Sequence, residues 1–284
     1  MKKSIIAALV LLTISSCGRF ANKKDGGEKD RIVCVSKQLT ELMFALHQGN
    51  KIVGVDLSST YPPEATKITT VGYHRMLSAE GIISLDPTVV IHQGDIAPPN
   101  VMVQVKEVGI PIKVYPAAPS IDSTKILIRL LGKEFGQDTA ANRLVTKMES
   151  DLAKADSVVK KYGTKPKVMI IHFGRAGNQY FVMGTRGTAN EMIKRAGGIN
   201  AADTSSFRNL SPEAIMRAQP DVILATDFGF DRVGGMEKFM ELPGIGLTPA
   251  AKNKKIFRIE EHDLVYFGPR SGENILLMAN LIHQ

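Results

Sequence analysis

Cysteine is scarce in this sequence, and its scarcity excludes two kinds of site. The 284 residues contain only Cys17 and Cys34. Cys17 ends the predicted N-terminal signal, so Cys34 is the one cysteine of the remaining chain. A disulfide within the chain and a cysteine-rich metal site are therefore excluded. Cys34 lies in the apolar run "RIVCVS" (31–36), which indicates a buried small side chain rather than a reactive thiol.

An apolar run of membrane-spanning length is also missing at the N-terminus. In "MKKSIIAALVLLTISSC", two lysines precede an apolar run over 5–14, which is typical of a secretory signal peptide (1–17) and too short for a permanent membrane helix. The ending "ISSC" resembles a lipobox, in which Cys17 carries the lipid; the alternative is an ordinary signal peptide with an incidental cysteine. The polar segment 18–30 is predicted to be a flexible tether. We therefore expect a lipid-anchored protein of the cell envelope, periplasmic or on the outer face of the cytoplasmic membrane.

Signatures of several common enzymes and of nucleic-acid binding are absent as well. The sequence contains no GxSxG, HExxH or P-loop motif, and no GxGxxG that follows a strand. The net charge is +8, but part of it lies in the signal and tether. No dense Lys/Arg block with interleaved aromatic residues occurs, which argues against nucleic acid as a partner. An anionic small ligand remains compatible with this composition.

The first half of the chain alternates between strand and helix patterns. Short apolar runs indicate strands at residues 31–36, 51–56, 88–93 and 110–116. Helical spacing of apolar residues separates several of these runs, and Gly49 and Gly109 mark helix ends. This rhythm predicts an α/β lobe over 31–137 with a mainly parallel sheet.

A long helix is predicted to follow, and the strand and helix rhythm then restarts. Residues 138–162 lack internal Gly and Pro. They carry one apolar stripe, formed by Leu144, Met148, Leu152, Ala155 and Val159. The restart begins with "KVMIIHFG" (167–174), so we expect a second α/β lobe over 163–284. The predicted architecture is two Rossmann-like lobes joined by one connecting helix.

An internal repeat supports two related lobes. "LSAEGIISLDPTVVI" and "LSPEAIMRAQPDVIL" align at an offset of 133 residues. Each copy places a serine at a helix N-cap, Ser78 or Ser211, and a glutamate at the second helical position, Glu80 or Glu213. Convergent helix caps are the alternative explanation, but the proline and strand that follow in both copies favour duplication. A ligand would then bind between the lobes, at the ends of parallel strands.

The segment "TTVGYHRMLSAEG" (69–81) gathers three side chains that suit an iron-containing, anionic ligand. A tyrosinate such as that of Tyr73 is a known ligand of heme iron. The alternative is that Tyr73 is a partly buried loop aromatic with a structural role only. The adjacent Arg75 would stabilise a phenolate or pair with a carboxylate of the ligand. His74 lies between them in the sequence.

Two further candidates lie in the second half. His172 ends the apolar part of "KVMIIHFG", where it would reach a cleft; a structural histidine bonded to backbone is the alternative. "GTRGTANEM" (184–192), which contains Arg186, is glycine-rich before a predicted helix. Such a segment is either an anion-binding loop or an ordinary turn with a helix cap.

Several segments resemble, in the same order, the hemin-binding components of bacterial ABC importers of the HmuT, ShuT and PhuT type. They are "STYPPEATKITTVGYHRMLSAEGIISLDPTVVI", "GTRGTANEMIKRAGGINA", "LSPEAIMRAQPDVIL", "LPGIGLTPAAKN" and "FGPRSGENILLMANLIH". The resemblance runs from about residue 31 to the end. It implies the class III periplasmic binding protein fold, with a stiff connecting helix, and a binding protein rather than an enzyme.

The resemblance also assigns roles to individual residues. It implies that Tyr73 is the axial ligand of the heme iron, that Arg75 lies near a propionate and that His172 is a ligand from the second lobe. Glu80 and Glu213 correspond to the glutamates that dock on arginines of the permease. The implied partners are heme, an ABC permease with its ATPase, and an outer-membrane heme receptor system.

The sequence departs from the family pattern at two places. His74 stands where relatives often carry Met or another apolar residue, so it would either compete for the iron or contact the porphyrin face. "TDFGFDR" places Asp227 and Phe228 where relatives often have Thr-Arg-Gly, and displaces Arg232. The alternatives are a cobalamin or ferric-siderophore binder on the same scaffold, and a heme-handling envelope enzyme.

Overall fold

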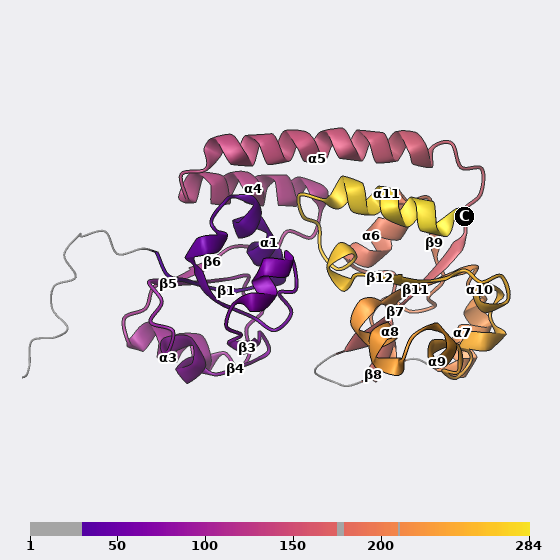
Figure 1. The fold of residues 1–284 in the computed structure, drawn as a ribbon, viewed down its shortest axis with the longest axis horizontal. Helices are drawn as coiled ribbons and strands as arrows, with labels where there is room; N and C mark the ends of the chain where they lie inside the picture. Colours follow the sequence, from indigo (N-terminus) through magenta and orange to yellow (C-terminus); the bar gives the residue numbers. More distant parts are fainter. Residues whose placement is uncertain (1–29, 175–178, 210) are drawn as a thin grey trace, which may run out of the picture. The chain divides into compact units, whose positions relative to one another are not determined.

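The computed structural model describes residues 30–174, 179–209 and 211–284 (Figure 1). The predicted signal peptide, its Cys17 and residues 18–29 of the predicted tether lie outside the described residues. Arg31–Gln284 forms one unit by its internal contacts. None of the helices described within it is long and apolar enough to span a bilayer.

The first half of the chain is built on a sheet of four parallel strands in the order β2-β1-β5-β6. The strands are β1 (Ile32–Val35), β2 (Ile52–Val55), β5 (Val89–His92) and β6 (Ile112–Val114). All four coincide with apolar runs in the sequence. Cys34 is fully buried in β1, and burial raises the pKa of its thiol to about 12. The expectation that Cys34 is a buried small side chain is confirmed.

Helices and one small hairpin complete this half. They are α1 (Lys37–Ala45), α2 (Ala79–Ile83), α3 (Asn100–Glu107) and α4 (Ile121–Glu134), with short 3₁₀ turns at Gly49–Lys51 and Pro63–Lys67 and a hairpin of β3 (Gly72–Tyr73) and β4 (Met76–Leu77). Helix α4 has no counterpart among the elements expected from the sequence. Its signal was present, because Ser120 and Ser123 form a capping box directly before an amphipathic stretch.

Helix α5 (Asp138–Val159) takes the place of the predicted connecting helix. It packs against α4 and against the last helix, α11 (Ser271–Ile282), so it contacts both halves of the chain (Figure 1). Its buried stripe consists of Ala141, Val145, Met148, Leu152 and Ala155. Leu144 and Val159, which the sequence placed in the stripe, are only partly buried. The face of α5 that packs against α4 and α11 is narrower than its apolar stripe.

The second half carries a mixed sheet in the order β10-β8-β7-β11-β12, with β9 also paired to β7. The strands are β7 (Lys167–Gly174), β8 (Gln179–Val182), β9 (Ile199–Asn200), β10 (Arg208–Asn209), β11 (Val222–Thr226) and β12 (Ile256–Ile259). Pairs of β7 with β9 and β11, and of β11 with β12, are parallel; β8 is antiparallel to β7 and β10. A mainly parallel sheet is therefore correct for the first half and only partly correct here. The connection from β7 to β8 is too short for a parallel crossover.

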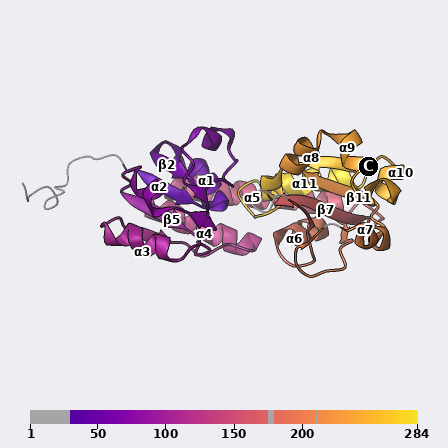
Figure 2. The same cartoon turned by 90° about the horizontal axis from the view of Figure 1, so that it is seen from below.

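Six helices accompany the second sheet in the described part of the chain. They are α6 (Thr188–Arg195), α7 (Pro212–Ala218), α8 (Asp227–Val233), α9 (Met236–Met240), α10 (Pro249–Lys252) and α11, with 3₁₀ turns at Ile245–Leu247 and Glu261–Asp263. Figure 2 shows α1 to α4 grouped around the first sheet and these helices around the second. The α/β fold class predicted from the sequence is confirmed.

A charged cluster joins the two halves beside the sheets. The Arg270 side chain, just before α11, donates from Nε to Glu41 of α1 at 2.9 Å and from Nη1 to Asp263 at 2.6 Å. The ring of Tyr61 covers the guanidinium at 3.7 Å. Glu41 is 3% exposed, so its charge depends on this partner in place of water.

We predict that Glu41→Gln lowers the free energy of unfolding by about 2 kcal/mol, because the buried Arg270 guanidinium loses one of the two carboxylates that balance its charge. Chemical denaturation measures the change. The matched control is Glu134→Gln, which removes the charge from the exposed Lys113–Glu134 pair and should cost less than about 1 kcal/mol. Equal effects of the two variants would contradict the prediction.

Candidate functional site

A cavity of about 560 Å³ lies where residues of both sheets meet. This volume is within the range of about 300–1,000 Å³ that is usual for ligand pockets. Its lining combines aromatic and apolar side chains with several charged ones. The lining residues are Val35, Ser36, Lys37, Leu57, Ser58, Tyr73, His74, Arg75, Gln93, Asp95, His172, Gly174, Phe181, Met183, Phe207, Glu261 and Val265.

Tyr73 reaches this cavity from a hairpin, not from the loop that the sequence indicated. Gly72 begins the hairpin with φ of +107°, a conformation that favours glycine. The carbonyl of Gly72 accepts a hydrogen bond from the Leu57 N–H at 2.8 Å, which ties the hairpin to the segment after β2. The helix that follows, α2, begins only at Ala79 and has five residues. The predicted helix start with Ser78 as N-cap is correct, and Tyr73 lies in the hairpin that precedes this helix.

His74 is held between two carboxylates. Its Nδ1 lies 3.1 Å from Asp56 Oδ2, and its Nε2 lies 3.3 Å from Asp95 Oδ2. Its ring packs against the Tyr73 ring, with 4.3 Å between centroids. Burial opposes ionisation of Asp56, but hydrogen bonds from His74 and from Ser58 and Ser59 outweigh it, so the pKa of this carboxyl lies below its usual value.

The other cations of the cavity also face carboxylates. Arg75 is 64% exposed, and its guanidinium lies 4.0 Å from Asp95. Lys37, at the start of α1, contacts Glu261 Oε1 at 2.7 Å and so joins the two halves of the chain across the cavity. An anionic ligand would find two cationic side chains here, each with an acidic neighbour to displace or share.

His172 enters the cavity from the second sheet. It lies inside β7, which continues to Gly174, and its register partner in β8 is Phe181. The hydroxyl of Thr226 lies 3.3 Å from His172 Nδ1, and this contact orients the ring. The prediction that His172 faces the same space as Tyr73 agrees with the lining of the cavity.

Aromatic and apolar side chains supply the remaining walls. Phe207 is 60% exposed and packs edge-on against Phe181, with 6.3 Å between centroids. Leu57 is 47% exposed on the opposite half of the chain. Exposed apolar side chains that line a cavity suit a flat, hydrophobic ligand, because water leaves both surfaces on binding.

The structure places the other predicted residues outside this cavity. Arg186 is exposed in the turn before α6, and the lining residues do not include it. Glu80 and Glu213 are exposed at the second positions of α2 and α7. Ser78 and Ser211 accept hydrogen bonds from the Gly81 and Ala214 N–H groups, so both predicted N-caps are confirmed.

The segment after β11, where the sequence differs from the family pattern, contacts other parts of the second half. Asp227 Oδ1 accepts a hydrogen bond from the Glu261 N–H at 2.9 Å. The guanidinium of Arg232 lies over the Phe173 ring at 5.2 Å. Arg232 is not among the residues that line the cavity around Tyr73.

Four charged residues in or beside the site escaped the sequence analysis, namely Lys37, Asp56, Asp95 and Glu261. A signal existed for two of them. Lys37 and Asp56 follow strands β1 and β2, and the carboxyl ends of parallel strands line ligand sites. Asp95 lies in an irregular segment after β5, and Glu261 begins the 3₁₀ turn after β12, so neither residue directly follows a strand end.

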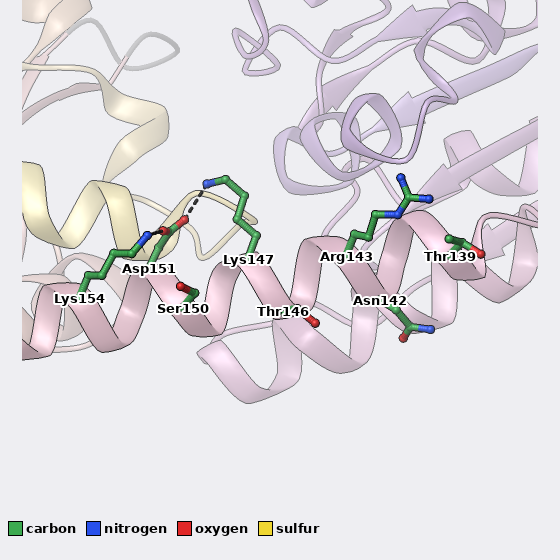
Figure 3. Close-up of a pocket in the computed structure, with 8 residues that line it drawn as sticks. All are labelled: Thr139, Asn142, Arg143, Thr146, Lys147, Ser150, Asp151 and Lys154. Carbon is green, nitrogen blue, oxygen red and sulfur yellow. Dashed lines mark hydrogen bonds and ion pairs between the residues drawn. The ribbon is translucent and has the colours of Figure 1, made fainter.

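A second hollow lies on the outer face of α5 (Figure 3). It is lined by Thr139, Asn142, Arg143, Thr146, Lys147, Ser150, Asp151 and Lys154. Lys147 and Lys154 both pair with Asp151. Because all eight residues come from one helix, this hollow offers a ligand a single wall, unlike the cavity around Tyr73.

Comparison with known proteins places the chain among solute-binding proteins. A family model described as "Periplasmic binding protein" matches residues 32–262. The solved structure of the periplasmic heme-binding protein RhuT from Roseiflexus sp. RS-1, in apo form, is similar with a TM-score of 0.83. It is 36% identical over 90% of this chain and 98% of that chain.

Curated relatives have two kinds of description. YvrC of Bacillus subtilis, an uncharacterized ABC transporter substrate-binding lipoprotein, is 27% identical over 100% of this chain and 98% of its own length. A cobalamin-binding protein of Halobacterium salinarum is 28% identical over 90% of this chain and 70% of its own length.

Proposed function

We propose that this chain, which belongs to the periplasmic binding protein family, binds heme in the cavity around Tyr73 and delivers it to an ABC-type permease. The observation that carries the proposal is the meeting of Tyr73 and His172, from two different sheets, in one cavity with aromatic walls. The similarity to a heme-binding protein of the same fold supports it. Heme is cargo here, not a resident cofactor.

The roles of individual residues follow from their chemistry. A phenolate oxygen such as that of Tyr73 is a ligand for ferric heme iron, and His172 would supply a second ligand from the second sheet. Arg75 and Lys37 would pair with propionates. We further propose two lobes, 31–137 and 163–284, joined by a connecting helix over 138–162.

Cobalamin is the rival ligand, because a cobalamin-binding protein is among the relatives. Heme carries two ionised propionates, whereas cobalamin carries amides on its ring and a single anionic phosphodiester in its nucleotide loop. The cations Lys37 and Arg75 line the cavity and favour the ligand with carboxylates. A ferric siderophore on the same scaffold is a further rival, and a heme-handling enzyme has less support because the family consists of binding proteins.

An absorption titration of the purified chain with hemin, and separately with cyanocobalamin, tests the function. We expect a saturable shift of the Soret band with hemin and a much weaker response to cyanocobalamin. Tighter binding of cyanocobalamin would transfer the proposal to cobalamin transport. No response to either would reject tetrapyrrole transport.

We predict that hemin binds about tenfold more tightly than hemin dimethyl ester, in which both propionates are uncharged. Two partly exposed ion pairs of at most about 1 kcal/mol each give this order of magnitude. Lys37→Met should reduce this preference, measured as the dissociation constant of the ester divided by that of hemin. Lys113→Met, which breaks an exposed ion pair, should leave the ratio unchanged. An unchanged ratio in Lys37→Met would exclude Lys37 from propionate recognition.

We predict that His172→Ala changes the spectrum of bound ferric heme and weakens binding by about tenfold, or about 1.4 kcal/mol. The loss of an imidazole ligand alters the coordination of the iron. Spectrum and heme stoichiometry are measured together at pH 7.5. If both are unchanged, Tyr73 is the only protein ligand.

The remaining assignments concern the envelope. We propose that Cys17 is lipidated and anchors the protein at the periplasmic side of a membrane, in agreement with the description of YvrC as a lipoprotein. Glu80 and Glu213 would dock on the permease, whose ATPase drives import. An outer-membrane heme receptor system would supply the ligand where the cell has one.

A further inference from the structure

The hairpin that carries Tyr73 depends on the rest of the molecule for its position. Strands β3 and β4 contribute two residues each, and an isolated hairpin of this size is unstable in water. Backbone bonds hold part of it: Ala97 N–H donates to the His74 carbonyl at 2.9 Å, and Leu77 N–H donates to the Ala97 carbonyl at 3.1 Å. These bonds fix the backbone but leave the Tyr73 ring free to rotate about its own side-chain torsions.

A chain of hydrogen bonds runs from α1 to the side chain of His74. Thr40 of α1 contacts the Ser59 hydroxyl at 3.0 Å, and Ser59 donates to Asp56 Oδ1 at 2.6 Å. The other carboxylate oxygen, Asp56 Oδ2, accepts from the Ser58 hydroxyl at 2.6 Å and faces His74 Nδ1. The side chain of Asp56 is fully buried and that of His74 is 13% exposed. His74 is therefore fixed at its inner end by a rigid, buried group.

The outer end of the same ring is fixed as well. Nε2 of His74 faces Asp95, on the segment after β5. Both ring nitrogens thus have carboxylate partners, and neither is directed to the iron of a ligand. The fixed imidazole packs against the Tyr73 ring in a tilted arrangement, with centroids 4.3 Å apart and an interplanar angle of 56°. Of the two expectations for His74, competition for iron does not agree with this geometry.

We propose that His74, fixed by Asp56, is a positioning residue that holds the Tyr73 phenol in the orientation needed for iron ligation. Asp56 is a stiff support for His74, since its buried carboxylate is also held by hydrogen bonds from the Ser58 and Ser59 hydroxyls. The inference rests on the proposed function for the identity of the ligand. The support of the Tyr73 ring by His74 is a property of the protein without heme.

The first test uses the protein without heme. NMR of the chain labelled only on tyrosine rings reports the order of Tyr73, whose signal is assigned by its loss in Tyr73→Phe. We expect His74→Leu to release the ring, seen as a shift and averaging of this signal, and His74→Asn, whose amide reaches Asp56, to restore much of the original signal. His283→Leu is the matched control, because His283 stacks on Tyr162 at 3.8 Å away from the cavity. An unchanged Tyr73 signal in His74→Leu would overturn the inference, whatever the ligand.

The second test uses hemin and a double-mutant cycle. Changes beside a metal ligand commonly cost about 10–100-fold in affinity, so we expect His74→Leu to lose about tenfold and to shift the charge-transfer absorption of ferric-tyrosinate heme. In the Tyr73→Phe background the same change should have little further effect, because the supported oxygen is gone. Equal losses in both backgrounds would overturn the inference while leaving heme binding intact. Failure of the unsubstituted chain to bind hemin would instead reject the proposed function.

Discussion

Replacement of Tyr73 by Phe is expected to lower the affinity for hemin by on the order of 100-fold and to abolish the charge-transfer absorption of ferric heme bound to tyrosinate. Phe keeps the ring that packs against His74 and removes only the oxygen. The loss of a direct ligand should cost at least the upper part of the 10–100-fold range that is typical of changes around metal ligands. Absorption titration measures both quantities in one experiment.

The control for this experiment is Tyr162→Phe. Tyr162 also stacks on a histidine, His283, so the chemical change is the same at a place away from the cavity. Affinity and spectrum should match those of the unsubstituted chain. Survival of both the absorption band and the affinity in Tyr73→Phe would exclude the phenolate as ligand and leave His172 as the candidate.

The architecture was predictable from the sequence wherever burial alone decides the structure. The apolar, β-branched runs of the central strands β1, β5 and β11 were recognisable because both faces of a central strand are buried. Helix α4 was missed although its capping box and apolar spacing are local signals. The antiparallel β8 is different, since strand direction depends on connection length and pairing, which apolar periodicity does not contain.

The site was predictable only in part, and for a similar reason. Chemistry and position left the roles of Tyr73 and His172 open, and the family resemblance assigned both as iron ligands. Lys37 and Glu261 are 224 residues apart and meet only in the folded chain. The restraint of His74 likewise depends on Asp56 and Asp95, and no spacing rule connects these three residues. Contact partners of this kind can be identified only from the tertiary structure.

The second large expected effect concerns the exposed glutamates of α2 and α7 and the uptake of heme by cells. We expect the double charge reversal Glu80→Arg with Glu213→Arg to reduce heme uptake by cells at least tenfold and to leave hemin affinity unchanged. Each glutamate is exposed in the first turn of a helix, one in each half of the chain. A partner with two matching cationic sites would meet repulsion at both. A single ion pair at an interface rim contributes little, so reversal of both charges is the sensitive probe.

The matched control for the uptake experiment is Glu64→Arg with Glu237→Arg. These are also exposed first-turn glutamates of short helices, one in each half, and the double change alters the net charge of the protein equally. Normal uptake with this control and loss with Glu80→Arg/Glu213→Arg would assign the effect to position rather than to charge. Both proteins must unfold at the temperature of the unsubstituted chain, because an unstable variant reaches the permease in smaller amounts. Undiminished uptake by a folded Glu80→Arg/Glu213→Arg variant would show that the permease recognises another surface, whatever the outcome at Tyr73.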